Sequence, residues 1–365
     1  MLRTALVALL VLHGLIHGLG VAKAFGWAEV SALTKTIGRP LGVVWGMAGA
    51  LFVLAAVLLL MRSEKWWVVA AVALLCSQVL IALHWHDARF GTVANLLVLL
   101  AVIVGAASWN FKRHYTRAVD RTVEATAALP AHRITEADLV ALPTCVQHYL
   151  RTAGVVGTLE PRNMRITFQG SIRSEGGPWM PFTTVQVNRF DVPARFFWMD
   201  ATMKGLPTKG LHAYEDGHAT MLIKLAGLVP VMNMKGPEMD TAETVTWFND
   251  LCLFAPGALL DPRITWSAVE ERSAQATFSN GGITIHATLL FDAQHRLVDF
   301  FSDDRYVVAP PAAPQKRRFS TPMRDHRTID GRLLPGYGET IWQLPSGPFT
   351  YGRFTLRSIA YDVSF

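Results

Sequence analysis

The sequence predicts an α-helical membrane bundle of four transmembrane helices, followed by a soluble α+β domain with a curved, half-barrel-like antiparallel sheet. Three observations lead to this prediction. Hydrophobic residues make up 51% of the 365 residues, the mean hydropathy is +0.27, and the excess lies before about Trp109. From Met164 onward, apolar and polar residues alternate with the period of two that is typical of strands. A chain of this length also commonly forms two structural units.

Four apolar segments in the first third of the chain have the length of membrane spans. A hydrocarbon core about 30 Å thick requires roughly 20 helical residues, because each adds about 1.5 Å. The segments run from Thr4 to Val21, Leu41 to Leu60, Trp66 to Leu83 and Val93 to Trp109, with charged residues between them. We therefore expect a multi-pass protein of the cell (inner) membrane, with the lipid bilayer as a partner.

The basic residues between the spans predict an orientation. An even number of spans puts the amino terminus and the soluble domain on one side. Seven basic residues would lie there: Arg3, Arg62, Lys65, Lys112, Arg113, Arg117 and Arg121. Four would lie opposite: Lys23, Lys35, Arg39 and Arg89. Because cytoplasmic loops carry the excess of Lys and Arg, a cytoplasmic domain is favoured. Cleavage of the first segment as a signal peptide, after Ala22-Lys23-Ala24, would leave the domain on the same side.

The segment after the spans predicts a connector and short helices. We expect a four-helix transmembrane region at residues 1–111, a linker or helical connector at 112–133, and the soluble domain at 134–365. Thr135 and Asp138 have the spacing of a capping box, so a helix should begin there. Pro143 is suited to begin a second helical piece, which Gly154 would end.

The rest of the domain predicts strands and one inserted helix. The alternating runs contain Met164 to Ile172, Met221 to Leu225, Ile283 to Phe291 and Ile359 to Phe365. Turn sequences separate them, at Gly176-Gly177-Pro178, Asp216-Gly217, Asn280-Gly281-Gly282 and Asp330-Gly331. Such short connections predict antiparallel neighbours and a long meander. Asp240 and Glu243 have cap-x-x-Glu spacing, which predicts a helix from Asp240 to Pro256.

Several motifs resemble an uncharacterised bacterial family in which a four-helix anchor is joined to this β-rich domain. They include Gly227-Leu228-Val229-Pro230, Gly236-Pro237-Glu238, Ala255 to Leu260, Arg324 to Arg327, Asp330 to Pro335, His13 to His17 and Asp87 to Thr92. The resemblance covers nearly the whole chain and implies no established activity, so it assigns no catalytic residue. More loosely, the domain is similar to the lipoprotein-carrier and lipoprotein-sorting half-barrels, which hold acyl chains between a curved sheet and a helical lid.

The overall charge and the cysteines exclude other classes. The formal net charge is +6, but the basic residues are scattered, which argues against a nucleic-acid partner. Cys76, Cys145 and Cys252 have no paired spacing, so neither a disulfide framework nor a cysteine-based zinc site is expected.

Methionines and aromatic residues in the domain suggest a hydrophobic pocket. Nine of the twelve methionines fall there, and flexible thioethers suit an adaptable apolar site. The candidate lining residues are Trp179, Met180, Trp198, Met203, Met232, Met234 and Trp247. The leading hypothesis is therefore a membrane-anchored module that binds a lipid or lipid-linked molecule on the concave face of the sheet. The same residue types would also fill an ordinary core.

Histidines in the apolar segments support an alternative. His13 and His17 are four residues apart and share a helix face, and His84 and His86 end the third segment. Ionisable groups are costly in a membrane, so these four are candidates for ligating haem or a metal in a redox protein. They also suit simple hydrogen bonds between helices. The sequence alone identifies no cofactor.

An enzyme acting on a membrane-soluble substrate is the third hypothesis, and the sequence leaves open whether the protein is an enzyme. It contains no Ser-His-Asp elbow, phosphate loop, dinucleotide fingerprint or His-Glu-x-x-His motif. The polar residues considered are Tyr214, Asp216, His218, Glu238, Glu243, Asp250, Asp303, Asp304, Arg305 and Tyr306. We expect Tyr214 to contact solvent, Glu243 to cap the inserted helix and Asp250 to be a solvated surface residue.

Overall fold

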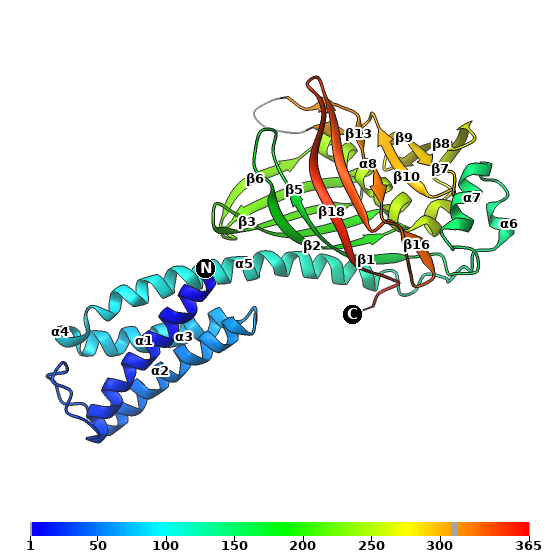
Figure 1. Ribbon diagram of the computed structural model, residues 1–365. Coiled ribbons are helices and arrows are strands. Elements are labelled where there is room, and N and C mark those ends of the chain that lie inside the picture. The colour runs from blue at the N-terminus through cyan, green and yellow to red at the C-terminus, as the bar shows by residue number, and fades with distance from the viewer. Residues whose placement is uncertain (1, 308–312, 365) are drawn as a thin grey trace. The chain divides into compact units, whose positions relative to one another are not determined.

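The computed structural model describes residues 2–307 and 313–364. It forms two compact units, one of Met1–Arg113 with Ala226–Leu228, and one of His114–Leu225 with Val229–Phe365. The first unit contains the apolar helices and the second contains the sheet (Figure 1).

Four helices of the first unit are long and apolar enough to cross a membrane, as the sequence predicts. They are α1 (Leu2–Phe25), α2 (Arg39–Leu60), α3 (Trp66–Leu83) and α5 (Gly91–Glu124), and the short α4 (Trp85–Ala88) precedes α5. Helices α1 and α2 pack closely through glycines. A Cβ at Gly14 would lie 2.9 Å from the carbonyl oxygen of Gly49, and one at Gly49 would lie 2.7 Å from that of Gly14. Such contacts between small residues let helix backbones approach.

Helix α5 is longer than the apolar segment that predicts it. The expected span ends at Trp109, but the helix continues to Glu124 and enters the second unit. There Tyr115, Val119 and Val123, at four-residue spacing, are all buried. The Tyr115 hydroxyl donates to the Val185 carbonyl at 3.1 Å, so the end of the helix is fixed to the sheet.

The second unit is built on a 14-stranded sheet whose paired strands are all antiparallel, which confirms the predicted α+β class. Its strands are β1 (Asn163–Ile172), β2 (Met180–Arg189), β3 (Ala194–Met203), β4 (Leu206–Glu215), β5 (His218–Leu225), β6 (Val229–Lys235), β7 (Ile264–Glu270), β8 (Ser273–Asn280), β9 (Ile283–Phe291), β10 (Leu297–Ser302), β13 (Phe319–Ser320), β14 (Met323–Arg324), β17 (Tyr337–Leu344) and β18 (Gly347–Tyr361). Two small ribbons add β11 (Tyr306–Val307) with β12 (Gln315–Lys316), and β15 (Arg327–Ile329) with β16 (Arg332–Leu334). Phe365, expected in the last strand, lies outside the described residues.

The strand order differs from a single meander. It runs β6-β5-β4-β3-β2-β1-β18-β17-β13-β10-β9-β8-β7, so two meanders flank the carboxyl-terminal hairpin. The inserted helix α8 (Pro237–Phe254) causes the difference, because it carries the chain from the β6 edge to the β7 edge. The helix contacts β4, β5 and β6 near one edge of the sheet and β9 and β10 near the other edge. The sheet therefore curls around α8 (Figure 1).

Helix α8 begins earlier than the sequence predicts. Its first residue is Pro237, and the preceding Gly236 has a φ of 112°, which favours glycine. The Asp240 carboxylate is not the cap but accepts from the Ala219 backbone N–H at 2.6 Å, fixing the helix to β5. Trp247 and Phe248 are fully buried and stack on Phe278 of β8 at 5.1 and 5.3 Å between ring centroids. These rings form the centre of the core.

Three short helices complete the unit: α6 (Glu136–Leu139), α7 (Thr144–Thr152) and the 3₁₀ helix η1 (Pro256–Leu260). The predicted capping box is present, since the Thr135 backbone N–H donates to the Asp138 carboxylate at 2.6 Å. The predicted turns at Asp216-Gly217 and Asp330-Gly331 are confirmed by positive φ values at all four residues.

Replacing Gly170 of β1 with alanine is expected to destabilise the curved sheet by about 2 kcal/mol through overpacking. A Cβ at Gly170 would lie 2.1 Å from the Arg353 carbonyl oxygen and 2.7 Å from the Phe182 ring. The matched control is Gly338→Ala on β17, where the nearest atom among the described residues is the Pro322 carbonyl oxygen at 3.7 Å. Denaturant unfolding of the full chain in detergent measures both; equal midpoints would contradict the packing at Gly170.

Candidate functional site

A buried ion cluster joins α8 to the inner face of the sheet. The Arg195 guanidinium of β3 lies between two carboxylates of the helix, with Nε 2.7 Å from Asp250 Oδ2 and Nη1 3.1 Å from Glu243 Oε2. All three residues are buried: Arg195 is 6% exposed, Asp250 is 7% exposed and Glu243 is 1% exposed. Glu243 and Asp250 are seven residues apart, so they lie on one face of the helix, two turns from each other. We call Arg195, Glu243 and Asp250 the ion cluster.

Two amides of β2 complete the hydrogen bonding of the ion cluster. Gln186 Nε2 and Asn188 Nδ2 donate to Asp250 Oδ2 at 2.8 and 3.2 Å, and Arg195 Nη2 donates to Gln186 Oε1 at 3.1 Å. One carboxylate oxygen thus accepts three hydrogen bonds. Buried charges are tolerated when they are paired and hydrogen-bonded in this way.

The two carboxyls respond differently to burial. Burial opposes ionisation of Glu243, but the Arg195 charge and His212, 3.7 Å away, outweigh it and lower the pKa of Glu243 to about 2. For Asp250, burial outweighs Arg195 and the pKa of the carboxyl is raised. The pKa values of two carboxyls that share one guanidinium are therefore shifted in opposite directions.

The expected surface roles of three residues are wrong. Glu243 does not cap α8 and Asp250 is not solvated, because the helix lies inside the curl and is buried on nearly every side. Tyr214 is fully buried, and its hydroxyl lies 2.9 Å from Thr244 Oγ1. Arg195, which the sequence analysis did not single out, lies in the run Ala194 to Met199, where every residue is buried. The sequence signal that could have identified Arg195 as a buried site residue is its position within an otherwise apolar run.

A second guanidinium enters the interior from the opposite wall. Arg305 Nε donates to Thr246 Oγ1 of α8 and its Nη1 to the Tyr351 hydroxyl, both at 3.1 Å. Its guanidinium carbon lies 4.3 Å from the Phe319 ring centroid. Of the polar residues considered for an enzyme, Glu243, Asp250 and Arg305 therefore gather along one helix. Tyr214 also contacts this helix through Thr244, whereas Asp303 pairs with Arg318 and the His218 side chain is largely exposed.

Beyond the ion cluster, the inner face of β2 to β6 is mostly apolar. Residues paired across strands lie on the same face of a sheet. The pairing of Phe182 with Ala201, Met199 with Gly210, and Ile223 with Met232 continues the face that Arg195 begins. We define the apolar floor as Phe182, Met199, Ala201, Met221, Ile223, Leu225 and Met232. Five of its members are partly exposed; Phe182 and Met199 are buried.

The predicted pocket residues do not all meet. Strand alternation places Met180, Met203, Met232 and Met234 on the inner face. Trp247 lies on α8 within the core, where its indole donates to the Arg189 carbonyl. Trp198 lies on the outer face against Tyr115, with ring centroids 5.6 Å apart. Trp179 lies between the Arg173 and Arg353 guanidinium groups, at 4.4 and 4.3 Å.

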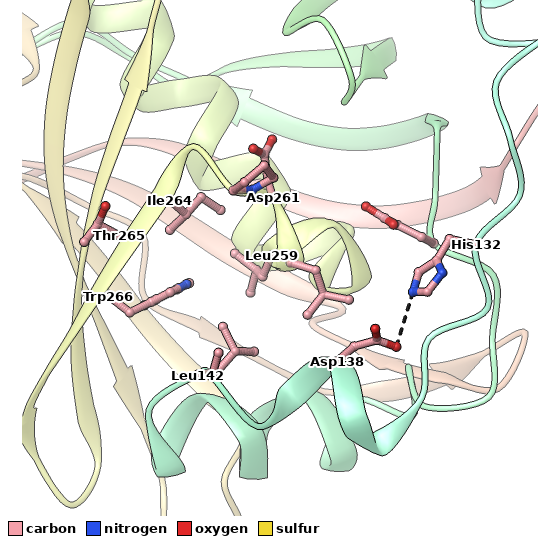
Figure 2. Close-up of a pocket in the computed structure, with 12 residues that line it drawn as sticks. His132, Asp138, Leu142, Leu259, Asp261, Ile264, Thr265 and Trp266 are labelled. Carbon is pink, nitrogen blue, oxygen red and sulfur yellow. Dashed lines mark ion pairs between the residues drawn. The ribbon is translucent and has the colours of Figure 1, made fainter.

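A separate cleft of about 550 Å³ opens between α6 and the start of β7 (Figure 2). Its apolar wall includes Leu142, Leu259 and Trp266. Its polar groups are His132, Asp138, Glu160, Asp261 and Thr265. His132 Nε2 lies 3.2 Å from Asp138 Oδ2, and burial raises the pKa of Glu160. None of the seven predicted pocket residues lines this cleft.

In the helical unit, His13 and His17 hydrogen-bond to other helices. His13 Nε2 lies 2.9 Å from Asn95 Oδ1 of α5, and His17 Nε2 lies 3.0 Å from Ser77 Oγ of α3. His17 Nδ1 donates to the His13 carbonyl at 2.8 Å, so both of its ring nitrogens have partners. Ser77 Oγ also lies 3.1 Å from Asn95 Oδ1. The network joins α1, α3 and α5.

The other two predicted histidines differ in burial. His84 is 3% exposed and its Nδ1 donates to the Leu80 carbonyl, whereas the His86 side chain is 85% exposed and lies 3.0 Å from Asp87. Among residues 2–307 and 313–364, no group of three or more His, Cys, Asp or Glu side chains is arranged to hold a metal. Haem or metal ligation by these histidines stays a prediction.

Fold and site together define a class: a half-barrel α+β domain with a helix inside its curl, joined to an apolar four-helix unit. The chain belongs to a family of unknown function, DUF6544, whose model matches residues 132–354. That range begins just before α6 and ends within β18. The predicted resemblance to an uncharacterised family is thereby confirmed.

Solved structures with some similarity include lipoprotein-sorting domains. A domain of a candidate outer-membrane lipoprotein-sorting protein from Vibrio parahaemolyticus has a TM-score of 0.36 and 7% identity, covering 56% of this chain and 86% of its own. A LolA superfamily protein from Nitrosomonas europaea has a TM-score of 0.34 and 8% identity, covering 59% and 93%. A β-barrel-like DUF1849 protein from Brucella abortus has a TM-score of 0.20 and 11% identity, covering 55% and 98%. No curated protein matches the chain.

Replacing Arg195 with methionine should destabilise the domain by roughly 3–5 kcal/mol, because two buried carboxyls lose their cation. Adding Glu243→Gln and Asp250→Asn should recover much of that loss, since no buried charge then lacks a partner. The matched control is Arg189→Met on β2, which breaks a more exposed pair with Asp191 and should cost under about 1 kcal/mol. Chemical unfolding of the full chain measures all three; a triple variant no more stable than the single one would contradict the ionic origin of the loss.

Proposed function

We propose that the protein is a membrane-anchored module that holds a hydrophobic ligand, a lipid or lipid-linked molecule, on the inner face of its curved sheet. The observation that supports this most is the apolar floor. Met221, Ile223 and Met232 stay partly exposed there, although α8 buries the neighbouring part of the same face. Apolar area left in water costs about 25 cal/mol per Å², which a bound acyl or isoprenoid chain would recover.

The shape of the inner face suits an elongated ligand. The ion cluster and α8 close the floor at one end, and the strands continue past them to the β3–β4 and β5–β6 turns. Met180 and Met203 extend the inner face toward that open end. Flexible thioethers adapt to chains of differing shape, which favours a lipid over a rigid polar ligand.

The helical unit supports the membrane part of the proposal. Its four helices have the length and composition of membrane spans. We place the protein in the cell (inner) membrane with its domain in the cytoplasm, on the seven-to-four excess of basic residues. A tether of this kind would keep the floor close to its source of lipid.

A photoreactive fatty acid added to the full chain in nanodiscs should cross-link to peptides of β3 to β6. Met232→Asp should reduce that cross-linking by about tenfold, because a carboxylate on the floor must be desolvated against the bound chain. Asn233→Asp, the control, adds the same charge at the neighbouring exposed residue of β6. Peptide mass spectrometry measures the yield; equal yields in the two variants would refute binding at the floor.

A fluorescent protein fused after Phe365 should fluoresce in intact cells, and alkaline phosphatase fused at the same place should be inactive. Both outcomes follow from a cytoplasmic domain. Replacing two basic residues at the end of the last span with acidic ones, by Lys112→Glu and Arg113→Glu, should weaken the preference for a cytoplasmic domain. Active phosphatase in the unmodified sequence would show that the orientation is reversed, without affecting the proposal for the floor.

An enzyme on a membrane-soluble substrate is a second candidate, favoured by the gathering of Glu243, Asp250 and Arg305 beside the floor. Carboxyls with oppositely displaced pKa values are typical of acid–base pairs. Lipid extracts incubated with the full chain or with the Glu243→Gln variant test it by mass spectrometry. An unchanged lipid profile in both would leave binding as the function.

A further inference from the structure

We propose that the β3–β4 and β5–β6 turns dock onto the bilayer surface, so that the open end of the apolar floor faces the lipids. This inference rests on the proposed function and adds the route by which a ligand enters. The docking edge consists of Lys204, Leu206, Val229 and Val231, at one end of strands β3 to β6.

The exposed side chains of the docking edge match a lipid interface. Leu206, Val229 and Val231 are 42%, 58% and 46% exposed, although turns of a soluble domain are normally polar. Lys204 is exposed beside them, at a φ of 50° in the β3–β4 turn. Apolar side chains with a nearby lysine are the composition that binds headgroups and the acyl boundary of an anionic membrane.

The docking edge is continuous with the apolar floor. Leu206 pairs with Met203 across the β3–β4 turn, and Val229 pairs with Leu225 across the β5–β6 turn. Because paired residues share a face, Leu206 and Val229 extend the inner face to its end. A ligand leaving the bilayer at this edge would stay on apolar side chains up to the ion cluster.

Fluorescence quenching in nanodiscs tests the docking edge. The dye NBD is attached to Leu206→Cys or Val231→Cys of the full chain, and the lipids are phosphatidylcholine and phosphatidylglycerol carrying doxyl groups. The control is Val192→Cys in the β2–β3 turn, at the opposite end of β3 and equally exposed at 45%. The unsubstituted chain measures labelling at Cys76, Cys145 and Cys252. We expect strong quenching at positions 206 and 231, little at 192, and less at 206 after Lys204→Glu.

Three outcomes would overturn the proposal: no quenching at 206 and 231, quenching at 192 of the same size, or energy transfer between two labelled copies, which would show pairing of β6 edges instead. These results are separate from the test of the floor. Cross-linking of the fatty acid without quenching would leave the floor as a binding site and remove only the docking. Quenching without cross-linking would retain the docking and remove the ligand.

Discussion

The interaction on which the domain most depends is the sharing of the Arg195 guanidinium between Glu243 and Asp250. It fixes one face of α8 to β3 at two points that are two turns apart, with Gln186 and Asn188 orienting Asp250 from β2. The same helix contacts strands from both edges of the sheet. A buried cation with two carboxylates has few geometries that leave no charge unpaired, so the cluster specifies where the helix lies as well as holding it. The curl of the sheet follows from a helix fixed in this place.

Fixing α8 over one end of the inner face leaves the other end without a helix. At the covered end the rings of Trp247, Phe248 and Phe278 stack on one another and are fully buried. At the uncovered end β3 to β5 keep the same alternation and direct apolar side chains inward, and the register shift of β6 opposite Ile223 and Lys224 puts both Met232 and Val229 on that face. The apolar floor is therefore a consequence of a helix shorter than the curl that encloses it. A lipid is a ligand of the right chemistry for that remaining surface.

Alternation and turn sequences predict individual strands and turns, but they do not predict which distant strands and side chains pair. The candidate pocket residues are identified by residue type alone. Met180, Met203, Met232 and Met234 lie on the inner face of the sheet, but Trp198 lies on the outer face, since aromatic residues line both faces of β3. The pairing of β1 with β18 joins residues nearly 200 positions apart, as Met164 and Tyr361 show, and no turn signal announces it. The ion cluster is equally non-local, since a carboxylate in a helix resembles a surface residue until its arginine partner is found.

Exposed apolar side chains are distributed differently in the two units, but in both units their location suits contact with lipid. In the helical unit, many leucines and valines are exposed on the helices, and the polar groups of His17, Ser77 and Asn95 hydrogen-bond to one another inside. That is the arrangement a bilayer requires. Among the described residues of the sheet unit, the exposed large apolar side chains are Val140, Leu159, Val192, Leu206, Val229 and Val231. Three of these six meet at the open end of the floor. Lipid is the one solvent that would suit both that end and the helical unit.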